Sequence, residues 1–178
     1  MPEPAAPPSD YGLLVPREWF RVDLVRDGWR PQLKTFTDHH TSGLDAERRQ
    51  RLWRSLCAAA EAGVARGGLE FYLLPGLGPE APVAASLIVS VLPPPVEAVA
   101  RDALLADLAT RHGERAAPVQ LDAGPAVAVE SADGLDVYVP MPDGVGGCLV
   151  LTFDSAAGPL PELSRLYRAI AGSLRWIR

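Results

Sequence analysis

The run of residues from Val83 to Leu92 limits the possible folds more than any other part of the sequence. Nearly every side chain in it is apolar, several are β-branched, and prolines stand on both sides of it. A transmembrane helix needs about 20 apolar residues, so this run is too short to cross a bilayer. A strand with one face in water alternates apolar and polar residues, whereas a strand buried on both faces reads as a continuous apolar run. The run therefore predicts a central strand in a sheet that has a layer of helices on each face.

Hydrophobic periodicity predicts the other elements. Apolar residues spaced three and four apart predict helices, and short alternating or apolar runs between turn residues predict strands. The predicted helices are 44–66, 96–112, and one that begins near Pro159 or Pro161 and ends at 177. The predicted strands are 19–24, 69–74, 83–92, 119–130 with a break at Gly124-Pro125, 135–141 and 147–153. Ser42 or Asp45 is expected to cap the first helix and Gly67-Gly68 to end it, and residues 26–42 are expected to form an irregular excursion.

Together these elements predict one α/β (α+β) domain. We expect a single α/β/α sandwich, with a central, mainly antiparallel sheet of about six strands flanked by helices on both faces. A chain of 178 residues is long enough for one core and does not require a second. Residues 13–178 are predicted to form this domain, and residues 1–12 a flexible proline-rich leader.

Composition and charge exclude several classes of function. The net charge of -5 and the pI near 5.2 argue against nucleic acid as a partner, because such proteins concentrate positive charge against phosphates. No apolar stretch is long enough for a membrane span. Residues 1–10 contain neither a basic region nor an apolar run, so no secretory signal is expected and the protein is predicted to be cytoplasmic.

Asp38, His39 and His40 form the one cluster of carboxylate and imidazole groups in the sequence. Metal ligands converge on one point, whereas adjacent residues of a loop point in different directions, so we predict no metal site there. Cys57 and Cys148 are too far apart for a zinc pair and too few for a disulfide framework. No motif for nucleophilic catalysis or phosphate binding is present. We therefore expect no catalytic residue, no cofactor and no enzymatic activity, and a solvated or partner-facing loop at His39 and His40.

Two groups of side chains are candidates for binding a partner protein. The outward side of the first long helix carries Arg48, Arg51 and Arg54, which form either a patch for an acidic partner or an ordinary solvated helix face. The aromatic candidates stand near or inside the 26–42 segment and either anchor an interface or cap the end of the sheet. They are Trp19, Trp29 and Phe36.

The region of the last three strands is acidic. Its carboxylates are expected to lie in solvated turns and at strand edges, as their turn-forming chemistry favours. The alternative is a surface for a cation or for a basic partner. The residues concerned are Asp122, Glu130, Asp133, Asp136 and Asp143.

The order of elements and a set of core residues resemble the PsbP-like α/β/α sandwich family. The residues that carry this resemblance are Leu14-Val15-Pro16 with Trp19-Phe20, the strand 149–153 followed by Leu163, Leu166 and Tyr167, and the segment 170–176. This family includes a photosystem subunit, a yeast nuclear-import factor that binds the GTPase Ran, and mycobacterial lipoproteins. The resemblance implies a protein-binding role and no catalytic residue. Residues 68–73 are also similar to small actinobacterial proteins associated with type VII secretion loci, and the near absence of lysine is typical of a GC-rich bacterial genome.

The leading interpretation is therefore a non-catalytic protein-binding module. On the resemblance, we expect an accessory, chaperone or immunity factor of an actinobacterial type VII secretion or toxin system, with another protein as its partner. One alternative is a small-molecule-binding or enzymatic domain with a pocket between the sheet and residues 26–42. Another is a subunit of a homo-oligomer.

Overall fold

The computed structural model describes residues 10–78, 80–93, 100–142, 147–156, 158 and 160–177. Within them the protein is of the α+β class, as the sequence predicts. The helices are α1 (Trp29–His40), α2 (Ala46–Ala65), α3 (Arg101–His112), the short 3-10 helix η1 (Gly113–Arg115) and α4 (Pro161–Gly172). The strands are β1 (Asp10–Gly12), β2 (Phe20–Asp23), β3 (Gly68–Gly78), β4 (Ala81–Leu92), β5 (Ala116–Leu121), β6 (Gly124–Glu130), β7 (Gly134–Pro140), β8 (Cys148–Ser155) and β9 (Arg175–Ile177).

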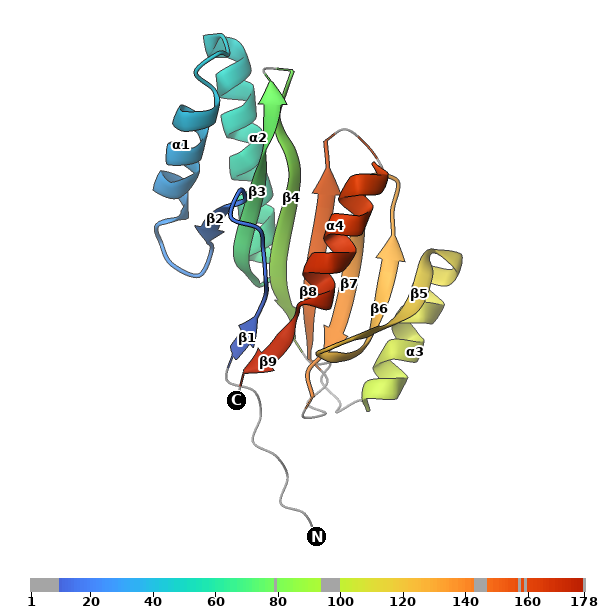
Figure 1. Cartoon of the computed structure of the whole chain (residues 1–178). Coiled ribbons are helices and arrows are strands. Elements are labelled where there is room, and N and C mark those ends of the chain that lie inside the picture. Colours follow the sequence, from blue (N-terminus) through green and yellow to red (C-terminus); the bar gives the residue numbers. More distant parts are fainter. Residues whose placement is uncertain are drawn as a thin grey trace.

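Seven of the described strands form one sheet in the order β2-β3-β4-β8-β7-β6-β5 (Figure 1). Every pair of neighbours in it is antiparallel, which confirms the predicted strand direction. The sheet has one strand more than the sequence predicts. The reason is that the predicted 119–130 strand turns back on itself before Gly124, whose φ of 123° suits only glycine, and forms the β5–β6 hairpin.

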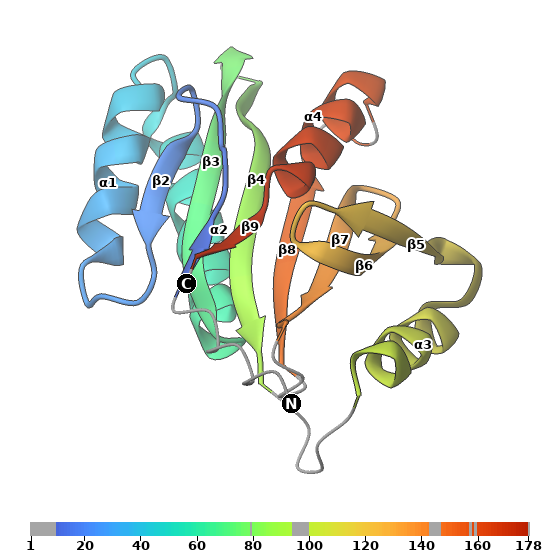
Figure 2. The same ribbon diagram turned by 60° about the horizontal axis from the view of Figure 1, so that its bottom comes forward.

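Helices lie on both faces of the sheet, as predicted. The helix α4 packs on one face, together with a small ribbon in which β1 pairs with β9, and we call this side the α4 face. The helices α1 and α2 pack at one end of the opposite face and α3 packs at its other end, and we call this side the α2 face. Figure 2 shows α2 and α3 at opposite ends of the sheet, with the middle strands between them.

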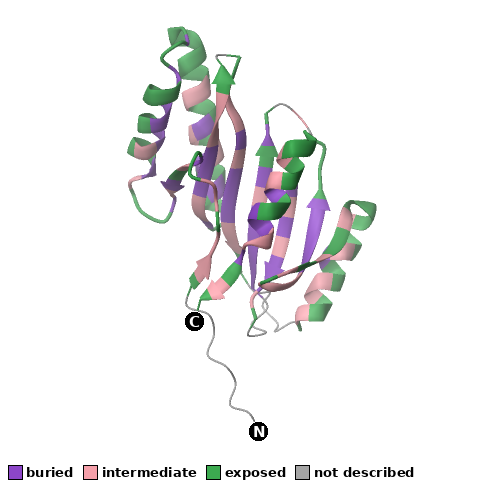
Figure 3. Ribbon diagram, in the orientation of Figure 1, coloured by how far each residue is buried: buried purple, intermediate pink, exposed green. Residues whose placement is uncertain are grey.

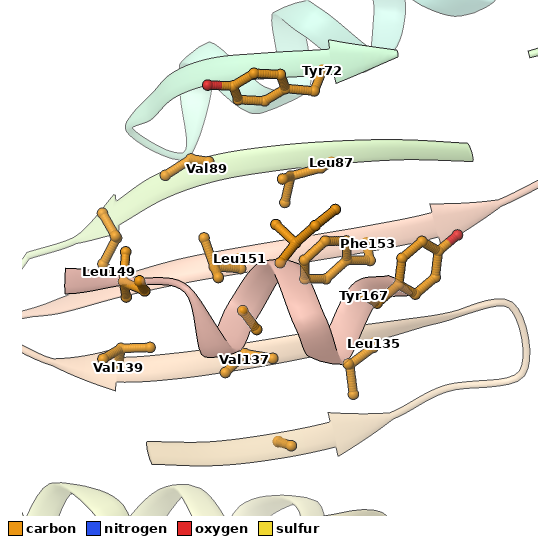
Figure 4. Packing of buried hydrophobic residues seen from close by; sticks show 14 of the residues in the cluster. Tyr72, Leu87, Val89, Leu135, Val137, Val139, Leu149, Leu151, Phe153 and Tyr167 are labelled. Carbon is orange, nitrogen blue, oxygen red and sulfur yellow. The ribbon is translucent and has the colours of Figure 1, made fainter. Parts of the chain in front are cut away.

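The largest core lies on the α4 face. Alternate residues of the middle strands point toward α4, and the ring of Phe153 stacks on that of Tyr167 with 4.7 Å between centroids (Figure 4). The buried strand residues of this face include Leu87, Val89, Val137, Leu149 and Leu151. Buried residues concentrate along the same strands in Figure 3, while the outer sides of the helices are exposed.

The core on the α2 face is divided into two parts. One part lies under α1 and α2 and contains Phe36 and Phe71, and the other lies under α3 and contains Leu108 and Val129. The predicted burial of the 83–92 strand is therefore met only in part on the α2 face, where Ile88 is buried but Ser86 and Ser90 are half-buried. Between these two groups of helices, no described helix covers the middle strands of the sheet, and they form a strip on the α2 face.

The 26–42 segment differs from its prediction, because most of it forms α1 instead of an irregular excursion. Pro31 falls in the first turn of α1, where proline is tolerated because the N–H groups there have no partner within the helix. Trp29, Leu33 and Phe36 then follow at helical spacing and are buried against α2 and the sheet. Of the polar residues that suggested a loop, Asp38, His39 and His40 are exposed, whereas Thr37 and Thr41 are buried and their hydroxyls donate to backbone carbonyls of α1.

Both ends of the domain also differ from their predictions. Residues 10–12 belong to the predicted leader but form β1, and residues 1–9 lie outside the described residues. The last helix ends at Gly172 instead of 177, and the chain continues as β9. The first part of the predicted 96–112 helix lies outside the described residues, and α3 begins at Arg101.

The predicted ends of the long helix are confirmed. The side chain of Asp45 accepts a hydrogen bond from the backbone N–H of Arg48 at 2.7 Å, which is an N-cap. Gly67 has a φ of 79°, and a Cβ there would lie 2.7 Å from the carbonyl oxygen of Val91. A glycine is thus needed for the chain to turn from α2 into β3. None of the described helices is both long and apolar enough to cross a membrane.

Candidate binding groove

A cavity of about 690 Å³ lies on the α2 face, beside the C-terminal end of α2. Its floor is formed by β4, β8 and β7, and its wall by the last turn of α2 and by Arg66 and Gly67, which follow that helix. We call it the α2 groove. Its lining residues are Gly63, Ala65, Arg66, Gly67, Ile88, Ser90, Val91, Leu92, Pro93, Asp136, Tyr138, Val150 and Thr152.

The register of the three strands arranges the floor in rows across the sheet. The first row is Ser90, Val150 and Tyr138, and the second is Ile88, Thr152 and Asp136. The third row continues the strip beyond the groove with Ser86, Asp154 and Gly134. Each row thus mixes hydroxyl, carboxylate or glycine positions with at most one aliphatic side chain. The floor is chemically unlike the α4 face of the same strands.

A second cavity of about 320 Å³ continues the strip along the middle of α2. It is lined by Leu56 and Ala59 of α2 and by Ser86 and Asp154 of the sheet. Since α2 and β4 border both cavities, the two follow one another along β4. The hollow part of the surface is consequently elongated in the direction of the strands.

Local sequence explains why α2 leaves the strip open. The helix presents Leu56, Ala60 and Gly63 to the sheet, so its contact side becomes smaller toward its C-terminal end. A Cβ on Gly63 would lie 3.3 Å from the Leu24 side chain and 3.5 Å from the Ile88 side chain. The helix therefore packs closely over β3, against Leu24 on one side and Ile88 of β4 on the other.

The far side of the groove is formed by Tyr138. Its ring lies against the imidazole of His112 at the end of α3, with 5.7 Å between ring centroids. Burial raises the pKa of Tyr138 above its usual value, and the carboxylate of Asp136 raises it further, while Arg66 has a smaller opposite effect. The phenol is thus neutral at physiological pH and is able both to donate and to accept a hydrogen bond.

Asp136 is the half-buried carboxylate of the groove. In the part of the chain that the structure describes, no hydrogen-bond donor or cation contacts its oxygens. Many other carboxylates have such a partner, including Glu70 with Arg21, Glu61 with Arg30 at 2.6 Å, and Glu130 with Arg168. Asp136 is therefore a hydrogen-bond acceptor available to a ligand in the groove.

The predicted aromatic candidates are core residues and do not line the groove. Trp19 is buried on the α4 face, and Trp29 and Phe36 of α1 are buried against α2 and the α2 face of the sheet. Their burial agrees with the packing alternative that the sequence left open. The alternative hypothesis is a pocket between the sheet and residues 26–42. The side chains of Trp29, Leu33 and Phe36 occupy this space.

His39 and His40 lie at the exposed C-terminal end of α1. The ring of His40 lies 4.7 Å from that of Phe36 and 4.9 Å from that of His39. Burial against these neighbours, more than the charge of His39, lowers the pKa of His40. Within the described ranges, no group of three or more histidine, cysteine or acidic side chains is arranged to hold a metal ion.

The predicted arginine patch lies on the outer side of α2, away from the groove. Arg48 contacts Glu80 at 3.2 Å and Arg51 contacts Glu47 at 2.6 Å, whereas Arg54 is exposed. Two of the three charges are thus partly compensated within the chain. Their role toward an acidic partner remains a prediction.

The acidic residues of the last strands fall into different environments. Asp122 and Asp133 are exposed in turns, as their chemistry predicts, and Glu130 pairs with Arg168 of α4. Asp143 lies outside the described residues. Among the described members of this set, Asp136 alone lines the groove.

Sequence reasoning did not identify the remaining groove residues as a site. A signal was present, because Ser86 and Ser90 interrupt the apolar 83–92 run at positions that face one side of the strand. Thr152 and Asp154 do the same in β8. The alternation of these polar residues with apolar ones predicts a solvent-exposed strip in the middle of the sheet.

Comparison with known proteins adds no family. No protein-family model matches the chain, and no curated protein matches it. The fold and the groove thus define an α+β protein with an elongated surface groove of mixed polar and apolar lining.

Proposed function

We propose that the chain is a non-catalytic protein-binding module that holds an extended segment of a partner protein in the α2 groove. The observation that supports this function is the strip of the α2 face that no described helix covers, at a place where nearly all residues on the other face of the same strands are buried. Two cavities in line along β4 fit an extended chain better than a compact ligand. Backbone groups of such a segment would meet the hydroxyls of Ser90 and Thr152.

Binding at an edge of the sheet is less favoured by the structure. Pro118 in the edge strand β5 has no N–H to donate to an added strand. The other edge strand, β2, has four residues, and its Asp23 N–H already donates to the side chain of Gln32 at 3.0 Å. The face of the sheet is therefore the better candidate for recognition.

The biological setting of the proposal comes from the resemblance to the PsbP-like family, whose members mostly bind other proteins. On that basis we propose an accessory, chaperone or immunity factor of an actinobacterial type VII secretion or toxin system. In an alternative form of this proposal the partner is a second copy of this chain, which would make the protein a homo-oligomer. Sedimentation at several concentrations distinguishes self-association from binding to a different protein.

A second candidate function is the binding of a small molecule. The volume of the α2 groove falls within the range of roughly 300–1,000 Å³ that is usual for such sites. The neutral phenol of Tyr138 and the carboxylate of Asp136 would orient a ligand that carries an amine or hydroxyl group.

Site-specific crosslinking tests the proposed function. A photo-crosslinking amino acid at Ser90, in the floor of the groove, is expected to link the protein to one partner in its native host. The same amino acid at Gln120, an exposed strand position outside the groove, serves as the control. Ser90→Trp is expected to abolish capture of that partner and Gln120→Trp to leave it unchanged. Equal crosslinking from both positions, or crosslinking from neither, would refute a partner in the groove.

A further inference from the structure

We infer that the occupant of the α2 groove is an extended segment that carries basic side chains at alternate positions next to an apolar one. This inference rests on the proposed function and names the chemistry of its partner. It is carried by the distribution of charge along the groove and by the spacing of the rows in its floor.

Charge is unevenly distributed along the strip. Arg66 lies at the same end as Tyr138, where its charge acts on the phenol. Asp136 occupies the next row, and Asp154 the row after that, at the border of the second cavity. A cation is therefore repelled at the Tyr138 end and attracted toward the Asp154 end.

The two carboxylates have no cationic partner among the described residues. One oxygen of Asp154 accepts the neighbouring N–H of Ser155 at 2.9 Å, and its side chain is exposed. Asp136 is half-buried and accepts nothing, so it is less well solvated than a carboxylate in water. A guanidinium or ammonium group from a ligand would provide charge-assisted hydrogen bonds that the fold itself does not supply.

Strand geometry fixes the spacing of the side chains that fit. Successive rows of the floor are two residues apart along each strand, which is roughly 6.5–7 Å. An extended ligand has the same repeat, so its residues i, i+2 and i+4 would stand over successive rows. The row of Val150 and Tyr138 accepts an apolar side chain, the row of Asp136 a basic one, and the row of Asp154 a second basic one. The expected pattern is apolar-x-basic-x-basic, in either chain direction.

Selection from a phage-displayed library of random dodecapeptides tests this inference. The full chain is immobilised and compared with Ser90→Trp, Asp136→Asn and Asp122→Asn. Asp122 is an exposed turn carboxylate, so its replacement makes the same change of charge outside the groove. Peptides enriched on the unchanged chain are then synthesised, and their dissociation constants are measured by fluorescence anisotropy at low and at physiological salt.

We expect the enriched peptides to show the apolar-x-basic-x-basic pattern. Asp136→Asn should weaken their binding about tenfold, as the loss of one partly buried charge-assisted hydrogen bond does, and Asp122→Asn less than twofold. Binding should also weaken with added salt. Circular dichroism and thermal unfolding establish that each variant is folded. Lysine amide alone should not bind, which distinguishes recognition of a peptide segment from binding of a small cation.

Three results would overturn the inference: no enriched peptide, enriched peptides without basic residues, or equal binding by the Asp136→Asn and Asp122→Asn variants. Crosslinking of a native partner from Ser90 would leave the proposed function intact in each of these cases. Peptides that bind the Ser90→Trp variant as well as the unchanged chain would instead refute the groove as the binding site.

Discussion

A hydrogen bond between Tyr11 and Glu70 joins the N-terminal strand β1 to the sheet. The phenol of Tyr11 donates to Oε2 of Glu70 at 2.5 Å, and the hydroxyl of Tyr72 donates to the same oxygen at 3.1 Å. Arg21 completes the set with an ion pair to Oε1. The side chain of Glu70 is only 12% exposed, so these donors replace most of its contact with water. Replacing Tyr11 with phenylalanine removes one donor and keeps the aromatic packing.

The size of the expected effect follows from this arrangement. A hydrogen bond to a charged acceptor contributes roughly 1.5–3 kcal/mol to folding. In Tyr11→Phe, Glu70 retains the donors from Tyr72 and Arg21, so no acceptor is left without a partner and the lower end applies. We expect the free energy of unfolding to fall by about 1.5 kcal/mol. For a domain of this size, that corresponds to a fall in Tm of roughly 3–6 °C.

Urea unfolding followed by tryptophan fluorescence and circular dichroism measures this change. The midpoint should fall while the denaturant slope stays the same, because the surface exposed on unfolding is unaltered. Tyr138→Phe is the matched control, since no hydrogen bond within the described residues involves its hydroxyl, and its effect should stay below about 0.5 kcal/mol. Equal effects of the two substitutions would refute the argument that the Tyr11–Glu70 hydrogen bond holds the terminus.

Two further predictions concern the folded state as a whole. Each of the four tyrosines has a raised pKa, chiefly through burial, and that of Tyr167 is raised to about 12. The folded state therefore holds these phenolic protons more tightly than the unfolded chain. The free energy of unfolding should be constant up to about pH 10 and should fall as the pH rises further. Appreciable tyrosinate absorbance of the folded protein at pH 10 would contradict this prediction. Asp45→Ala removes the N-cap of α2 and should lower the free energy of unfolding by about 1 kcal/mol. Asp45→Asn keeps a capping oxygen and should lower it by less than half as much. Urea unfolding measures both changes, and equal losses would show that the cap does not stabilise the helix.

Most elements of the fold could be predicted because their sequence periods are long and regular. The α2 helix repeats its apolar spacing over many turns and is bounded by Asp45 and Gly67. The α1 helix was missed because its stripe is short and Pro31 suggested a break. The β1–β9 pairing could not be predicted from three-residue segments at opposite ends of the chain, since only the folded domain brings them together.

The groove was harder to predict because coverage of a strand is not a local property. The 83–92 run indicates a central strand, and that position is correct. Whether each face is covered depends on where α2 and α3 pack, and their positions depend on contacts such as Gly63 with Leu24 and Leu108 with Val129. The sequence thus indicates the sheet but not the open strip on it.

The side chains of the strip differ from those of a covered strand face, which indicates that the sequence is adapted to leave this face uncovered. In β4 and β8, most residues facing α4 are large and apolar and the smaller ones are Ala85 and Ser155, whereas those facing the groove include Ser90 and Thr152. A shift of register by one residue would exchange the two sets, burying hydroxyls under α4 and exposing leucines. Ile88 and Val150, at 9% and 8% exposure, belong to the cores under α2 and under α3 and border the hydroxyls of the strip on its two sides. Apolar side chains set between hydroxyls and an uncompensated Asp136 are the mixture expected of a surface that another chain covers part of the time.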